Sequence, residues 1–226
     1  MEPSSLVEEI LSQWQAHRSL TGPPPTPIRL WSEPCRGVWI GSGWGPAVPY
    51  PPIDHGGGHR NHGYLRIKDN LPTLGLIPEA VDWPEMAAFL AAANASQSPI
   101  ETVGCEKAFS PAQGQDVATV QVGSYFDVIF TDIALNDRPE NALVLSGHFL
   151  QAMEGCQRWW SGVEIELRRL RGLIGAASPW GLLVRVSGYG RNEDEARKCW
   201  GASIERITKT VVKLSRNLRW SGYDLK

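Results

Sequence analysis

Three of the chain's five histidines lie within eight residues, in the segment 54–63 with the sequence DHGGGHRNHG. Imidazole is the side chain that most often binds transition metals, and glycine lets the backbone fold several rings toward one ion without steric cost. His55, His59 and His62, together with the carboxylate of Asp54, are therefore candidate ligands for zinc or another divalent transition metal. A metal held there could activate water, which would make the protein a metal-dependent enzyme of the hydrolase type.

The same segment also fits a solvated loop that contacts a partner. The histidine spacing matches no established zinc motif, and the intervening glycines exclude a helical His-x-x-x-His pair. His-Gly-Gly-Gly resembles the oxyanion loop of lipases and esterases, but the chain has no Gly-x-Ser-x-Gly motif to supply the nucleophile. The sequence therefore favours a partner-binding loop over a metal site.

Two other groups of reactive side chains are weaker candidates. If 126–135 is one unbroken strand, Asp127 and Asp132 lie on opposite faces, so we expect them to solvate an edge and to end the strand rather than to share a proton. Arg36 could raise the acidity of the neighbouring Cys35 thiol. No histidine or asparagine partner can be assigned to it, which favours a structural cysteine.

Aromatic and proline residues in the first half of the chain point to binding. Of the 17 prolines, 14 lie in the first 100 residues. Exposed aromatic side chains on stiff loops lose little entropy when they bind a partner. We therefore expect Trp39, Trp44, Tyr50 and Arg60 to contact a macromolecule, and the leading hypothesis is a non-catalytic binding or accessory protein with a protein partner.

A third hypothesis is nucleic-acid binding through the basic face of a helix at 193–215, which carries Arg206, Lys209, Lys213 and Arg216. The net charge of -2 and the pI near 6.2 provide no overall attraction to a polyanion. Charged residues opposite an apolar stripe are ordinarily a solvated face. Composition therefore disfavours a nucleic-acid partner.

The elements are clearest in 181–218. Leu182 to Val186 is a β-branched apolar run, and the following Gly188-x-Gly190 predicts a turn with positive φ. A dinucleotide site is disfavoured because a third glycine is missing and acidic residues fill the next helical turn. Asn192 and Glu195 predict a capping box that starts a long amphipathic helix. Its apolar stripe is Ala196, Trp200, Ser203, Ile207, Val211, Leu214 and Leu218.

Upstream of that unit, alternation predicts strands at 102–109, 118–122 and 126–135, and Asp137 is expected to cap a helix that ends before Gly155. The segment 157–172 fits a strand or a helix. We favour a strand, because it would pair with 181–187 and give β-α-β-β-α, the order of a split-βαβ, ferredoxin-like sheet with two helices on one face.

These elements predict an α+β fold with an antiparallel or mixed sheet, in a single domain over 1–226. Residues 1–100 form a loop-rich region containing many Pro, Gly and Trp residues, and 101–226 form the regular sheet-and-helix core. In the first region we expect helices at 5–20 and from Asp82 to Ala95, and short strands at 28–31, 37–40 and 64–67.

Cysteine usage and hydropathy indicate the compartment. Cys35, Cys105, Cys156 and Cys199 include no Cys-x-x-Cys pair, so we expect four reduced thiols. No apolar run is long enough to span a bilayer, and the acidic N-terminus is unlike a signal peptide. The expectation is a cytoplasmic protein that is not inserted in a membrane.

Overall fold

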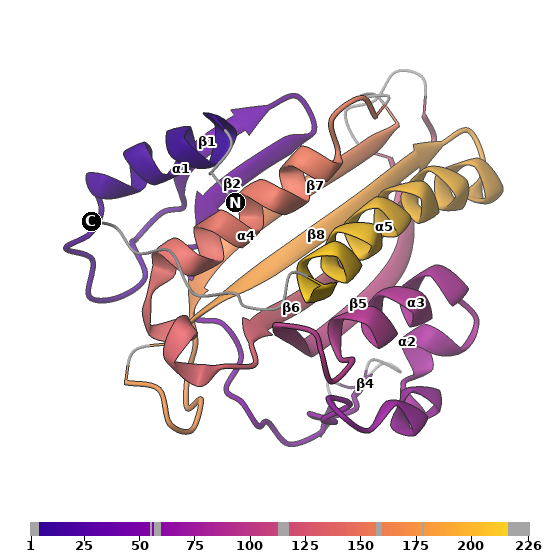
Figure 1. Cartoon of the computed structure of the whole chain (residues 1–226). Coiled ribbons are helices and arrows are strands. Elements are labelled where there is room, and N and C mark those ends of the chain that lie inside the picture. Colours follow the sequence, from indigo (N-terminus) through magenta and orange to yellow (C-terminus); the bar gives the residue numbers. More distant parts are fainter. Residues whose placement is uncertain are drawn as a thin grey trace.

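Six strands form one mixed β-sheet, and the longer helices lie across one of its faces (Figure 1). The computed structural model describes residues 5–54, 56, 60–112, 118–156, 160–177 and 179–216. In spatial order the strands are β1 (Ile28–Glu33), β2 (Arg36–Ile40), β7 (Ser161–Arg169), β8 (Trp180–Gly190), β6 (Val120–Phe130) and β5 (Ile100–Pro111). The helices are α1 (Ser5–Gln15), α2 (Pro78–Val81), α3 (Pro84–Ala93), α4 (Pro139–Ala152) and α5 (Glu193–Arg216), with 3-10 helices η1 (Leu71–Leu76) and η2 (Ile133–Asp137).

The strand order confirms the predicted split-βαβ arrangement. Strands β6 and β7 run parallel, are joined by α4, and are separated by β8, which pairs antiparallel with both. Strand β5 pairs antiparallel with β6 at one edge of this unit. At the other edge, β2 pairs parallel with β7, and β1 completes the sheet. The N-terminal hairpin therefore extends the same sheet that the C-terminal part builds.

Helix α5 approaches β8 very closely at two glycines. A Cβ at Gly188 would lie 2.3 Å from the backbone nitrogen of Trp200, and one at Gly190 would lie 2.3 Å from that of Ala196. Neither glycine is among the described residues with positive φ, so the predicted positive-φ turn is wrong. Both belong to the strand, and they are required because only a residue without a side chain leaves room for the helix backbone.

The start of α5 agrees with the sequence pattern. The Asn192 side chain accepts a hydrogen bond from the Glu195 amide at 2.9 Å, and the Glu195 carboxylate accepts from the Arg191 amide at 3.0 Å. The carboxylate thus reaches one residue further back than a standard capping box. Trp200 is fully buried at 0% exposure, and its indole nitrogen donates to the Ser124 hydroxyl at 2.8 Å.

Several predicted boundaries are corrected by tertiary contacts. The two strands expected at 118–122 and 126–135 are the single strand β6, which ends at Phe130 before η2. Tyr64 to Ile67 is not a strand, and α1 ends at Gln15 instead of Leu20. Asp137 does not cap α4, because its carboxylate accepts from the Ala177 amide at 3.3 Å. The favoured strand in 157–172 is present as β7.

All four cysteines are free, as expected. In the part of the chain that the structure describes, no helix combines the length and the apolar character needed to cross a bilayer.

We predict that Trp200→Ala lowers the free energy of unfolding by about 3–5 kcal/mol, because it leaves a cavity between α5 and β6. Trp200→Phe retains most of the ring but leaves the Ser124 hydroxyl without its donor, so we expect a smaller loss of about 1–3 kcal/mol. Urea unfolding followed by circular dichroism measures both. A Trp200→Ala variant with the wild-type midpoint would show that this contact does not hold α5 to the sheet.

Candidate functional site

The face of the sheet opposite the helices, called here the open face, carries polar and aromatic side chains. Strand residues alternate between faces, so Val122, Phe126 and Val128 of β6 enter the main core, while Gln121 and Tyr125 point the other way. The strand register places side chains of the open face in rows across the sheet. One row is Trp39, Glu166, Leu183, Asp127 and Gly104, and the next is Gly37, Glu164, Arg185, Tyr125 and Glu106.

An ion-pair network occupies the middle of this face. Glu166 accepts from Arg185 at 2.6 Å and from Arg168 at 3.0 Å. Burial by itself would raise the pKa of Glu166, but the hydrogen bonds and positive charges of the two arginines outweigh it and lower the pKa. The guanidinium groups are therefore held in fixed positions by a carboxylate that stays ionised.

Asp127 is the most perturbed acid on the open face. Its side chain lies in the central strand β6, and burial raises its pKa to about 6, although Arg168 and Arg185 act in the opposite direction. The nearest Arg168 nitrogen is 3.9 Å away. The expected role of Asp127 in solvating an edge is wrong, because β6 lies between β8 and β5. Asp132 does end the strand, since it accepts from the Ala134 amide that starts η2.

The segment after β2 covers one end of the open face. Gly45 and Val48 donate backbone hydrogen bonds to the carbonyls of Arg169 and Arg171. Val48 then contributes to a small second apolar cluster on this face, whose other buried members are Val103, Ile129, Leu170 and Leu173. The chain crosses from the β7 side to the β5 side, where the Tyr50 hydroxyl donates to the Val103 carbonyl at 3.0 Å. The rest of the face is left uncovered by this segment.

The four residues predicted to bind a partner lie on two sides of this crossing. Trp39 is half-buried on the open face, with its ring directly over Gly37. Trp44 is 46% exposed, and the Arg171 guanidinium lies 5.5 Å from its ring centre. Tyr50 lies on the other side, near β5. The backbone of Arg60 pairs with Asp54 in the β3 (Ile53–Asp54) and β4 (Arg60–Asn61) hairpin, and its side chain is outside the described residues.

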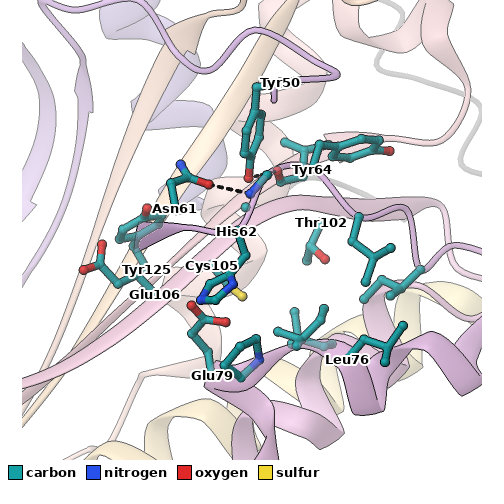
Figure 2. Close-up of a pocket in the computed structure, with 18 residues that line it drawn as sticks. Tyr50, Asn61, His62, Tyr64, Leu76, Glu79, Thr102, Cys105, Glu106 and Tyr125 are labelled. Atoms are coloured by element: carbon teal, nitrogen blue, oxygen red, sulfur yellow. Dashed lines mark hydrogen bonds between the residues drawn. The ribbon is translucent and has the colours of Figure 1, made fainter. Parts of the chain in front are cut away.

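A pocket of about 520 Å³ lies at the outer edge of β5 (Figure 2). Tyr50 and Tyr64 line one side of it with ring centres 6.1 Å apart, and Leu76 and Glu79 line the opposite side. His62, Cys105, Glu106 and Tyr125 also line it. Burial, followed by nearby acidic groups of which Asp127 is the strongest, raises the pKa of Tyr50 to about 12.

The chemistry of this pocket favours binding over nucleophilic catalysis. Burial, reinforced by the negative charges of Glu79, Asp127 and Glu106, raises the pKa of the Cys105 thiol to about 12. A reactive cysteine requires the thiolate, which this environment suppresses. Cys35 is similar, because burial and Glu164 raise its pKa, so Arg36 does not acidify it.

The predicted metal ligands are only partly within the described structure. Asp54 accepts a hydrogen bond from the Gly56 amide at 2.9 Å, and His62 is exposed at the pocket. His55 and His59 lie outside the described residues. Among the residues that are described, no group of three or more His, Cys, Asp or Glu side chains is arranged to hold a metal ion. The four-ligand site stays a prediction that elemental analysis of the purified protein can test.

The basic face of α5 is partly neutralised by its own neighbours. Lys209 pairs with Glu205 at 2.7 Å, and Arg206 donates to the carbonyls of Ala152 and Glu154 at 3.4 Å. Glu205 thus offsets the charge of Lys209, and the contacts of Arg206 hold its guanidinium against the end of α4, which weakens the attraction of this face for a nucleic acid.

No known protein family matches the chain, and no curated protein or solved structure matches it significantly.

Sequence reasoning missed the open-face network and most of the pocket. The sequence signal for the network is the alternation of the polar residues Glu164, Glu166 and Arg168 with apolar residues. Arg185 and Ser187 alternate with apolar residues in the same way in the next strand along the chain. No comparable signal exists for the pocket, because its lining comes from six separate stretches of chain.

We predict that Asp127→Asn becomes more stable relative to wild type as pH rises from 4 to 7. The folded protein retains a proton on Asp127 up to about pH 6. The unfolded chain releases that proton near pH 4, so the wild-type free energy of unfolding falls across this window by up to about 3 kcal/mol. Urea unfolding at pH 4, 5, 6 and 7 measures the difference, with Asp132→Asn at the exposed cap as the control. Parallel pH profiles for wild type and Asp127→Asn would contradict the assignment.

Proposed function

We propose that this protein is a non-catalytic binding or accessory protein whose open face receives a protein partner. The observation that carries the proposal is the ion-pair network of Glu166, Arg168 and Arg185, held on a sheet face that the helices leave uncovered. Side chains that are already fixed lose little entropy on association, which favours their use in binding.

Half-buried aromatic rings accompany the network. Trp39 and Tyr125 flank it, and Tyr189 lies further along β8. Tyrosine, tryptophan and arginine are the residue types enriched at protein interfaces and at their energetic centres. The open face offers all three, in positions set by a rigid sheet.

The charges on this face favour a protein over a polyanion. Glu164, Glu166 and Glu106 lie in the same two rows as Arg185 and the neighbouring Arg168. A nucleic acid would place phosphates next to these carboxylates, which is unfavourable. A protein surface with charges of both signs can complement them.

A row of short side chains leaves space on the open face. Gly162, Ser187, Gly123 and Ala108 lie across four strands, between the row that contains Tyr125 and the row that contains Tyr189. A Cβ at Gly123 would meet no atom within 4 Å. Projecting side chains of a partner could fill this space, with the tyrosines on either side.

We expect Gly123→Trp to weaken partner binding at least 10-fold, because the added indole would stand on the open face. The fold should tolerate it, since the position is unobstructed. Gly22→Trp is the matched control, because a Cβ there also meets nothing within 4 Å and the residue lies in the connection between α1 and β1.

The partner is first identified by crosslinking in cells that express the protein and is then purified. Titration calorimetry gives its Kd for wild type, Gly123→Trp and Gly22→Trp, and thermal unfolding confirms that the variants fold. Equal affinity of all three proteins for the partner would refute the open face as the binding surface.

A further inference from the structure

We infer that the pocket at the outer edge of β5 binds a guanidinium group, supplied by an arginine side chain of the partner that docks on the open face. This inference rests on the proposed function for the source of the arginine, and on the pocket alone for the chemistry of the bound group.

The pocket is continuous with the open face. Gly104, Glu106 and Tyr125 line the pocket. Gly104 and Glu106 also end the two central rows of the open face on β5, and Tyr125 is the neighbour of Glu106 on β6. A side chain from a partner seated on these rows would therefore enter the pocket around the edge of β5, past Glu106. Figure 2 shows Tyr125 and Glu106 together at this margin.

The charges of the lining select a cation. Glu79 and Glu106 line the pocket, and none of its described lining residues is lysine or arginine. Three cations lie close to it, and each already has partners. The Lys107 ammonium interacts with Glu79 and lies 4.6 Å from the centre of the Trp83 ring. Lys68 donates to three backbone carbonyls at 2.7 to 3.1 Å, and Arg66 pairs with Glu101. Lys107 thus offsets part of the charge of Glu79, and the remaining negative charge of Glu79 and Glu106 attracts an incoming cation.

The aromatic and apolar lining selects a flat cation on an aliphatic stem. Tyr50, Tyr64 and Tyr125 present ring surfaces, and Leu90 and Ile67 form a buried apolar floor at 1% exposure each. Guanidinium is planar and weakly hydrated, so it stacks on aromatic rings and pairs with carboxylates better than a compact ammonium does. The apolar floor suits the three methylenes of an arginine side chain.

A further reactive group that lines the pocket, the Cys105 thiol, is consistent with binding and not with catalysis. The Cys105 thiol is an uncharged part of the wall and makes no hydrogen bond among the described residues. A pocket of about 520 Å³ is within the ordinary range for ligand sites, and it exceeds the volume of one side chain, so main chain next to the arginine could also enter.

The test titrates the full-length protein with Nα-acetyl-arginine amide and follows backbone amide signals by NMR. We expect saturable shifts at Gly63, Gly104 and Cys105, with a Kd at least 10-fold lower than that of the neutral isostere Nα-acetyl-citrulline amide. Nα-acetyl-lysine amide should bind more weakly than the arginine probe. Equal binding of arginine and citrulline probes would overturn the inference, and equal binding of arginine and lysine probes would overturn the choice of guanidinium.

The double variant Glu79→Gln, Glu106→Gln should weaken the arginine probe at least 10-fold. Glu205→Gln is the matched control, because it removes one exposed carboxylate from α5, which contributes no residue to the pocket lining, and should leave the Kd unchanged. An unchanged Kd in the folded double variant would show that the carboxylates do not recognise the probe.

Two further measurements separate this inference from the proposed function. Gly123→Trp should leave the arginine probe bound while it blocks the partner, and excess arginine probe should displace the partner from wild type. A bound probe that does not compete with the partner would refute a partner arginine and assign the pocket to a free guanidinium ligand. If Gly123→Trp fails to affect the partner while the probe still binds, the proposed docking face fails and the guanidinium pocket stands.

Discussion

The close contact between α5 and β8 is the constraint on which the rest of the structure depends. Gly188 and Gly190 leave no side chain between strand and helix, so the helix backbone lies directly against the sheet and Trp200 reaches Ser124 on β6. Helix α4 covers the neighbouring strands, as a split-βαβ connection requires (Figure 1). The apolar side chains on one face of β6, β7 and β8 are buried under α4 and α5 in one core. The other face of these strands is left as a second surface with different chemistry.

That second surface carries ionisable side chains that are largely buried, where the loss of hydration makes a charge unfavourable. Asp127 is 8% exposed, and the nearest arginine nitrogen among the described residues is that of Arg168 at 3.9 Å, which is why burial dominates the pKa of Asp127. Glu166, one strand further along the same row, has two arginines within hydrogen-bonding distance and remains an ordinary anion. The pKa values of two acids in one row are thus shifted in opposite directions because of the positions of Arg168 and Arg185. A surface under no constraint except stability would replace such groups with apolar side chains.

The chain between β2 and η1 connects this surface to the pocket. Its backbone bonds to the residues after β7, its Val48 side chain joins the small apolar cluster, and its Tyr50 hydroxyl bonds to β5. Its only strands among the described residues are the short β3 and β4, which pair with each other, so the segment crosses the end of the six-stranded sheet instead of extending it. Tyr50 and Tyr64 are thereby brought together with Cys105 and Glu106 of the edge strand. The pocket is therefore a consequence of this crossing segment, which also covers one end of the open face.

The sequence by itself determined the elements whose signals are local. The asparagine cap of α5, its apolar stripe from Ala196 to Leu214 and the strand expected at 182–186 follow from periodicity and capping, which act over a few residues. Leu218, the last residue of the expected stripe, lies outside the described residues. The split-βαβ order also required the choice of a strand in 157–172, which rested on its expected pairing with 181–187. The sequence also identified Trp39, Trp44 and Tyr50 as aromatic residues outside regular core positions. Only the tertiary structure decided that Asp127 is central instead of at an edge, that Gly188 serves close packing instead of a turn, and that Glu79 and Tyr125 line one pocket. Each of these depends on which strands become neighbours, and a strand's neighbours are selected by contacts between residues far apart in the chain, which leave no periodic trace in the sequence.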